Sequence, residues 1–241
     1  MHDPRRILNL PALLNARDLG GYPTQDGAQT RWRSLVRADD LVQLTAAGVA
    51  ALADYGIRTV VDLRWPGEVS AAPHPIPRDL KDVEYHQVSL LMATENEWGE
   101  CVAGCTKEMW KCAVLDHTRP QLKRVLEVIA AADPKPLVFH CVAGKDRTGL
   151  VAALLLALAD VVPEAIAHDY VASGDRLRDA YVRRYPQFDP EQVADFVRCP
   201  EEGVYNMLDY LARQGGPRAF LRGIGLSGAE IERLYARLRA P

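Results

Sequence analysis

Residues 140–149 are His140-Cys-Val-Ala-Gly-Lys-Asp-Arg-Thr-Gly149, and they connect two apolar segments of unequal length. The segment before them, residues 137–140, is short and follows two prolines, which favours a buried strand. The segment after them, residues 150–159, is apolar on all sides and rich in strong helix formers, which favours a core helix. The sequence therefore predicts a strand, a loop that carries Cys141, and a helix.

Such a loop has the properties of an anion site. The first turn of a helix leaves backbone N–H groups unpaired, and these groups attract an anion together with the helix dipole. Gly144 allows a close approach of the backbone, and Arg147 can reach back to hold two oxygens of a phosphate with its planar fork. We expect the phosphate to be surrounded by Val142, Ala143, Gly144, Lys145 and Thr148.

The same positive surroundings favour the thiolate form of Cys141, which is its nucleophilic form. The hydroxyl of Thr148 could donate a hydrogen bond to this thiolate. The alternative is a buried cysteine at a strand end, followed by a surface arginine.

Length and composition are those of one globular domain, residues 1–241. Hydrophobic residues make up 48% of the chain and charged residues 25%, and the net charge of −3 argues against a general nucleic-acid binder. The longest apolar run, between Arg147 and Asp160, is well short of the ~20 residues that cross a bilayer. The N-terminal apolar stretch is too short for a signal peptide, so we expect a cytoplasmic protein, with export by another route left open.

The cysteine pattern is that of reduced thiols. The chain has five cysteines, an odd number without the spacing of a disulfide scaffold. Cys101, Cys105 and Cys112 lack a second pair of metal ligands, so we expect no metal site and no cofactor. A reversible disulfide that shields Cys141 is an alternative.

The order of the expected elements is that of an α/β protein. Asp26-Gly27 favours a hairpin turn before a strand at residues 31–37. Thr45 and Gly56 should delimit a helix that leads into a strand at residues 57–63, with a loop at residues 64–68. A further strand is expected at residues 83–90 and a helix at residues 118–132, where Thr118 is the cap.

The C-terminal third should be helical. Helix starts are predicted at Pro163, Asp175, Asp189 or Pro190, Pro200, Pro217 and Ser227. Residues 95–117 fit no clear pattern and could form a lid or an insertion. The expected architecture is a central sheet with helices on both sides, and ligands gather at the carboxyl ends of its strands.

The pattern His-Cys-x-x-Gly-x-x-Arg-Thr matches the signature loop of the cysteine-dependent protein tyrosine phosphatases. Two further motifs are Asn15-x-Arg17-Asp18-Leu19-Gly20-Gly21 and Asp62-Leu63-Arg64 with Glu68. Together with Gly144-Lys145-Asp146-Arg147-Thr148-Gly149, they resemble the bacterial protein-tyrosine-phosphatase-like family. The resemblance implies a three-layer fold with a central, mostly parallel sheet. It also implies activity on phosphotyrosine, phosphoserine or phosphothreonine, or phosphoinositides.

Two aspartates compete for the role of the proton donor to the leaving group. Asp62 lies at the carboxyl end of an expected strand, and the alternative is that it only fixes its loop by pairing with a basic side chain. Asp146 lies inside the loop, in an arrangement that resembles lipid phosphatases whose loop aspartate is the proposed acid. Its alternative is a local structural hydrogen bond, and we favour Asp146 as the acid.

Two cations bear on the substrate class. Lys145 could contact a second phosphate, which would favour phosphoinositides, or it could be a solvated lysine. Arg64 is a tentative substrate-binding residue for the same reason.

The predicted function is that of a phosphomonoester hydrolase that forms a phosphocysteine intermediate and releases inorganic phosphate. A phosphorylated protein or a phosphoinositide is the expected substrate. A rhodanese-like sulfurtransferase and a non-catalytic phosphate-binding adapter are the alternatives.

Overall fold

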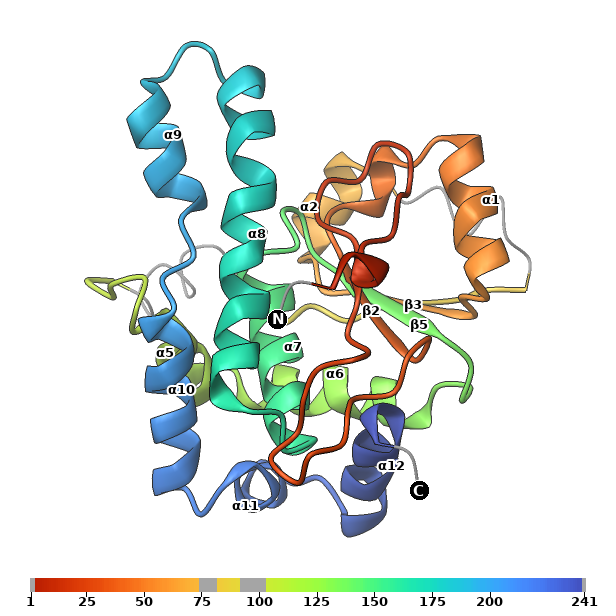
Figure 1. The fold of residues 1–241 in the computed structure, drawn as a ribbon, viewed down its shortest axis with the longest axis vertical. Coiled ribbons are helices and arrows are strands. Elements are labelled where there is room, and N and C mark those ends of the chain that lie inside the picture. Colours follow the sequence, from red (N-terminus) through yellow and green to blue (C-terminus); the bar gives the residue numbers. More distant parts are fainter. Residues whose placement is uncertain (1–2, 74–81, 92–102, 240–241) are drawn as a thin grey trace.

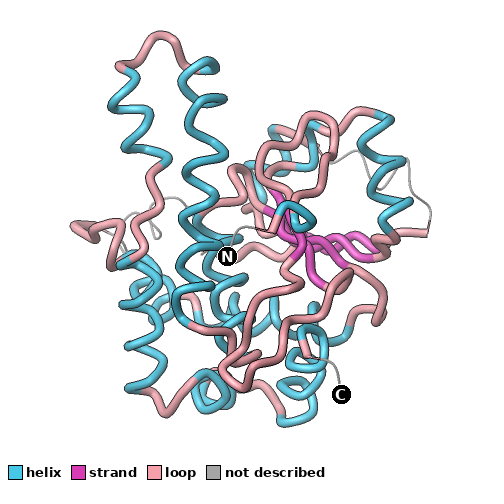
Figure 2. Tube along the Cα trace, viewed as in Figure 1, coloured by secondary structure: helices cyan, strands magenta, loops and turns pink. Residues whose placement is uncertain are grey.

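The computed structural model describes residues 3–73, 82–91 and 103–239. A five-stranded sheet lies at the centre, in the order β1-β2-β5-β3-β4 (Figures 1 and 2). Its strands are β1 (Arg17–Asp18), β2 (Leu35–Ala38), β3 (Thr59–Asp62), β4 (Glu84–Gln87) and β5 (Leu137–His140). β1 is antiparallel to β2, and the other neighbours are parallel.

Alternation along the strands sends successive side chains to two different helical layers. On one face, Val61 and Phe139 pack with the helices α6 (Arg119–Ala131) and α7 (Asp146–Leu158). On the other face, Val60 and Val138 pack with α1 (Ala46–Tyr55). Figure 1 shows the sheet between these two layers. The predicted three-layer α/β fold with a mostly parallel sheet is confirmed.

α7 is the core helix that the sequence predicted, and all its residues from Thr148 onward are buried. It begins at Asp146, inside the motif, so that the last residues of the motif form its first turn. The central strand β5 ends at His140, which is the first residue of the motif. The parallel neighbour β3 places Asp62 opposite His140, at the same edge of the sheet.

Some of the remaining helices in the described part of the chain pack on α7, and the rest lie elsewhere in the molecule. They are the short 3-10 helices η1 (Pro4–Arg6) and η2 (Leu41–Gln43), then α2 (Pro66–Ala71), α5 (Trp110–His117), α8 (Pro163–Arg184), α9 (Pro190–Val197), α10 (Glu202–Arg213), α11 (Pro217–Gly223) and α12 (Gly228–Leu238). α8 and α9 form a helical hairpin whose tip projects from the body (Figure 1). In the part of the chain that the structure describes, no helix is long and apolar enough to cross a membrane.

Most predicted helix ends are confirmed. The Thr45 side chain accepts a hydrogen bond from the Gly48 backbone, and Gly56 ends α1 in the left-handed conformation. Ser227 and Glu230 form the predicted capping box of α12. A turn at Asp26-Gly27 is also present, because the amide of Thr24 donates to the carbonyl of Ala28 across it; the strand after this turn is the shorter β2.

Three local expectations were wrong. Residues 64–68 are not all loop, since α2 begins at Pro66. Thr118 occupies the predicted N-cap position of α6, but its side chain does not cap the helix, because its hydroxyl donates to the carbonyl of Val114 in α5. Asp175 starts no helix and lies inside the 22-residue α8. The expected lid at residues 95–117 is in part outside the described residues, and its last eight residues form α5, which packs against α10.

Candidate active site

Residues 141–147, called the phosphate loop below, connect the end of β5 to the first turn of α7. Cys141 is buried, with 3% of its surface exposed, and Gly144 has a φ of +63°. A Cβ at Gly144 would lie 2.4 Å from the carbonyl oxygen of Ala38 on β2. Both the backbone conformation and this close approach therefore require glycine, as the sequence predicted.

Donors from the N-terminal part of the chain hold the carbonyl groups of the phosphate loop. Asn15 Nδ2 donates to the carbonyl oxygens of Ala143 and Gly144, at 3.0 and 3.1 Å. Arg37 Nη2 donates to the carbonyl oxygen of Gly144 at 2.6 Å. The C=O and N–H groups of a peptide unit point in roughly opposite directions because the unit is planar and trans. Carbonyls that are held from outside thus leave their amides free to face the inside of the loop.

A buried carboxylate supports these donors. Asp169 on α8 accepts hydrogen bonds from Arg17 Nε at 2.7 Å and Tyr22 Oη at 2.9 Å, and it forms a short ion pair with Arg37. Arg17 also donates to Asn15 Oδ1 at 2.5 Å. Burial alone would raise the pKa of Asp169, but the positive charges of Arg17 and Arg37 lower it well below its usual range. This cluster connects the motif around Asn15 to the phosphate loop.

The roles of Arg37 and Asp169 were not predicted from the sequence. The sequence did indicate that Arg37 has a buried partner, because Arg37 lies in an otherwise apolar strand, Leu35 to Ala38. In the structure it is fully buried. A charged residue inside a buried strand needs a partner. The sequence does not show that the partner is Asp169, which is 132 positions away.

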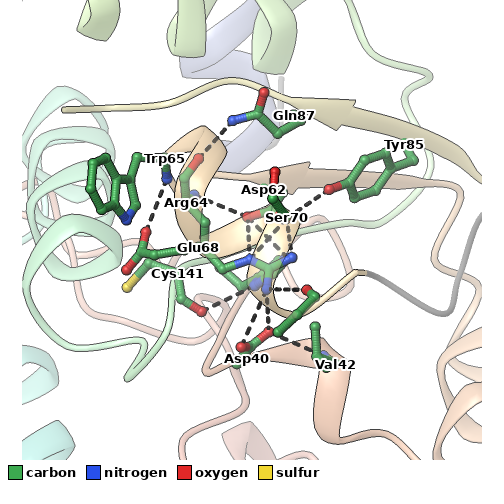
Figure 3. A network of polar contacts seen from close by, with 12 residues as sticks. Asp40, Val42, Asp62, Arg64, Trp65, Glu68, Ser70, Tyr85, Gln87 and Cys141 are labelled. Atoms are coloured by element: carbon green, nitrogen blue, oxygen red, sulfur yellow. Dashed lines mark hydrogen bonds and ion pairs between the residues drawn. The ribbon is translucent and has the colours of Figure 1, made fainter. Parts of the chain in front are cut away.

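Arg147 is held by Glu68, which lies in the first turn of α2. Arg147 Nη1 lies 2.5 Å from Glu68 Oε2, and Nη2 lies 2.8 Å from Oε1. Glu68 Oε2 also accepts from the amide of Trp65 (Figure 3). Burial would lower the pKa of Arg147, but the hydrogen bonds to Glu68 and the charge of Cys141 raise it. The pair fixes the direction of the guanidinium that was predicted to grip phosphate.

The surroundings of Asp62 do not suit a proton donor. Its side chain is fully buried and accepts from Arg64 Nε at 3.0 Å, Arg64 Nη2 at 2.7 Å and Tyr85 Oη at 2.7 Å (Figure 3). Burial would raise the pKa of Asp62, but the hydrogen bonds from Arg64 and the nearby His140 lower it to about 2. The carboxylate carries no proton at neutral pH, and the alternative in which it fixes its loop agrees with the geometry.

Arg64 does not face a substrate. Its side chain is fully buried between Asp62 and Asp40 (Figure 3). Its Nη1 also donates to the carbonyl of Ala72 at 3.0 Å. The tentative assignment of Arg64 to substrate binding is therefore wrong, because this guanidinium is used inside the protein.

Asp146 and Lys145 begin α7. The Asp146 side chain is 42% exposed, and its Oδ1 accepts a hydrogen bond from Tyr170 Oη at 3.0 Å. Lys145 is not a solvated lysine, because its side chain is 8% exposed and Nζ donates to the carbonyl oxygen of Phe196 at 2.7 Å. Nζ also lies 3.4 Å from Asp146 Oδ2. Asp146 is thus the acidic side chain of the phosphate loop that is both held by a partner and open to solvent.

Three other residues predicted to surround the phosphate lie in the phosphate loop or directly after it: Val142, Ala143 and Thr148. Val142 is 40% exposed, and Ala143 packs against the apolar cluster between α8 and α9. The Thr148 hydroxyl is buried and has no hydrogen-bond partner among the described residues, so it is available to a thiolate or a bound anion. No group of three or more His, Cys, Asp or Glu residues in the described ranges could hold a metal ion.

Comparisons with known proteins identify the family of this chain. The profile described as "Tyrosine phosphatase family" matches residues 8–240. A tyrosine-protein phosphatase of Nostoc commune is 32% identical over 223 residues, which cover 85% of this chain and 74% of that protein. The triple specificity protein phosphatase PtpB of Mycobacterium tuberculosis is 27% identical over 274 residues, which cover 95% of this chain and 97% of that protein.

Among solved structures, P. aeruginosa TpbA is similar with a TM-score of 0.38 and 20% sequence identity, over 68% of this chain and 86% of that chain. The family match spans nearly the whole sequence and includes the phosphate loop, the motif at Asn15 and Glu68. By this match, the chain belongs to the tyrosine phosphatase family.

Proposed function

We propose that this tyrosine phosphatase hydrolyses phosphate monoesters through a phosphocysteine intermediate on Cys141. The observation that carries the proposal is the placement of Cys141 and Arg147 at the two ends of one loop. The carbonyls of this loop are held from outside by Asn15 and Arg37, and its arginine is oriented by Glu68. Fixed donors around a point where charge develops are the main source of catalysis in phosphoryl transfer.

In the first step, Cys141 Sγ attacks phosphorus and forms the S–P bond while the P–O ester bond breaks. The leaving oxygen takes a proton from the carboxyl group of Asp146. Arg147, the loop amides and the Thr148 hydroxyl hold the other phosphate oxygens. We assign the acid to Asp146 because Asp62 is buried and ionised, whereas Asp146 is exposed enough to reach a substrate.

In the second step, water attacks phosphorus and the S–P bond breaks. The Asp146 carboxylate takes a proton from the attacking water, and Cys141 leaves as a thiolate. Inorganic phosphate is released, and the enzyme returns to its starting state with the proton again on Asp146.

Phosphotyrosine proteins are our first substrate class. Cys141 is 3% exposed, so the phosphorus must travel into the loop to meet it. A phenyl ester holds its phosphate farther from the peptide backbone than a serine ester does. Phosphoinositides are the second class to test, although a second phosphate on Lys145 would have to displace its bond to Phe196. The similarity to a relative named a triple specificity protein phosphatase supports a test of several substrate classes.

The test is phosphate release from phosphotyrosine, phosphoserine and phosphoinositide substrates by the wild type and by Cys141→Ser. Cys112→Ser is the matched control, because Cys112 is also buried but lies on α5, outside the loop. We expect release by the wild type and by Cys112→Ser and none by Cys141→Ser. Equal release by all three would refute the proposal, and sulfur transfer from thiosulfate to cyanide without phosphate release would favour a sulfurtransferase.

A further inference from the structure

A buried lysine lies behind the proposed proton donor. Lys111 on α5 is fully buried, and its Nζ has no hydrogen-bond partner among the described residues. This Nζ lies 3.1 Å from the centroid of the Tyr170 ring. An ammonium group out of water is costly unless something compensates its charge, and the face of an aromatic ring compensates it in part. The ammonium of Lys111 is therefore stabilised in part by the ring face of Tyr170.

Tyr170 connects this lysine to the phosphate loop. Its hydroxyl donates to Asp146 Oδ1 at 3.0 Å. Its ring packs closely on α7, since a Cβ added at Gly149 would lie 2.9 Å from Tyr170 Cδ2. The ring thus contacts both α7 and the ammonium of Lys111. The contacts form a chain of three side chains that ends at the carboxyl group of Asp146.

The charge of Lys111 depends on groups from several elements. Burial lowers the pKa of Lys111 to about 7. Asp146 and Cys199 favour its charged form, whereas Arg37 and Lys145 disfavour it. Because the charged form is the one present below the folded-state pKa, the ammonium is lost as the pH rises through about 7. The lysine changes its charge in the neutral range.

We propose that Lys111 is a positioning residue that acts on Asp146 through Tyr170. The ammonium on the ring face polarises the phenol and makes its hydroxyl a stronger donor to Asp146 Oδ1. With Oδ1 occupied in this way, Oδ2, which lies 3.4 Å from Lys145 Nζ, is the oxygen left to carry the proton for the leaving group. This inference rests on the proposed function and on Asp146 as the acid, and it assigns to α5 a role in protonation of the leaving group.

Two substrates separate this role from a general structural one. Para-nitrophenyl phosphate has a good leaving group that needs little protonation, whereas phenyl phosphate has a poor one. We expect Lys111→Met to lose about tenfold in kcat on phenyl phosphate and less than about twofold on para-nitrophenyl phosphate. Tyr170→Phe, which keeps the ring but removes the hydroxyl, should show the same pattern. The double variant should lose no more than Tyr170→Phe alone.

The pH profile gives a second readout. On phenyl phosphate, the wild type should lose activity as the pH rises through about 7, where Lys111 loses its charge. Lys111→Met should be low and lack this step, and Lys111→Arg, which stays charged, should be active and lack it too. Thermal unfolding of each variant shows whether it is folded, and if Lys111→Met is not, Tyr170→Phe and Lys111→Arg still provide the test.

Equal losses on both substrates, additive effects in the double variant, or pH profiles on phenyl phosphate that are identical in the wild type and Lys111→Arg would each overturn the inference. These outcomes differ from a failure of the proposed function. If the wild type released no phosphate, the function itself would be wrong. If Asp146→Asn kept full turnover on phenyl phosphate, the acid would be misassigned, whatever Lys111 does.

Discussion

Asp169→Asn is the substitution that most directly tests how the phosphate loop is supported. Asp169 is 2% exposed and is the anion that the buried guanidinium groups of Arg17 and Arg37 share. Asparagine has nearly the same shape, but one of its two terminal atoms is a donor and faces a guanidinium that can only donate. The substitution therefore leaves two buried cations with neither a counter-charge nor a full set of acceptors.

The expected cost follows from the burial of this cluster. Removal of one partner of a buried ion pair costs about 3–5 kcal/mol, because an uncompensated charge stays behind. For a domain of this size, each kcal/mol corresponds to roughly 2–4 °C in Tm, so we expect a decrease of about 10 °C. Asp195→Asn is the matched control. Its side chain is 64% exposed and pairs with Lys107 and Arg198 at the surface, so its loss should cost less than about 1 kcal/mol.

Urea unfolding at several pH values measures both variants. The positive charges around Asp169 lower its pKa, so its stabilising contribution is fully present above its unfolded-state pKa of about 4 and is lost as the pH falls toward the lower folded-state pKa. The difference in unfolding free energy between wild type and Asp169→Asn should thus be constant from pH 5 to 7 and shrink below about pH 4. Should Asp169→Asn lie within about 1 kcal/mol of the wild type at pH 7, or cost no more than Asp195→Asn, the cluster would not support the loop as argued.

Two further substitutions separate the roles of the acidic residues around the loop. Glu68→Gln keeps the size of the side chain but removes the charge that orients Arg147, and we expect kcat to fall by about 10- to 100-fold; steady-state kinetics with an unchanged kcat would show that Arg147 is oriented without Glu68. Asp62→Asn should cost about 3 kcal/mol in the unfolding free energy at neutral pH, because Arg64 loses its buried partner. Since Asp62 has a folded-state pKa of about 2, this cost should shrink as the pH falls below about 4. The dependence of kcat on the leaving group should stay that of the wild type, and a selective loss on phenyl phosphate would instead make Asp62 the acid.

The features that could be predicted from the sequence are those set by contacts over a few residues. The ends of α1 at Thr45 and Gly56 depend on hydrogen bonds within one helical turn, and so does the capping box at Ser227. The phosphate loop is of the same kind, since Cys141 and Arg147 belong to one strand–loop–helix unit. Local chemistry was sufficient to place Cys141 and Arg147, the proposed nucleophile and phosphate ligand, at the two ends of one loop.

The helix start predicted at Asp175 is absent, because tertiary packing overrides the local residue pattern. Ser173-Gly174-Asp175 has the residue types of a helix boundary, yet α8 continues through it. Gly174 serves a different purpose, because a Cβ there would lie 3.0 Å from the carbonyl of Val197 and 3.3 Å from the amide of Cys199. The glycine allows the chain after α9 to pack closely against α8.

The directions of charged side chains could not be predicted. Arg64 and Lys145 both follow strands at the ligand-binding edge of the sheet, where a cation is expected to face a substrate. In the structure, Arg64 turns inward to Asp62 and Lys145 turns to the carbonyl of Phe196, at the end of α9. The partners of both side chains depend on which distant segments the fold places next to them. For Lys145 this segment is α9, which is far from the loop in sequence.

The buried charges behind the phosphate loop follow one from another. A loop that offers its amides to an anion must have its carbonyls bound from outside, and Asn15 and Arg37 provide the donors. A guanidinium in that position is out of water and requires an anion, which Asp169 supplies from α8. Apolar side chains could replace such an ion pair without loss of stability in many proteins. Here they would remove the Arg37 donor and leave Asn15 alone to hold the carbonyl of Gly144, so the requirements of the loop, and not stability alone, explain why these charges are buried.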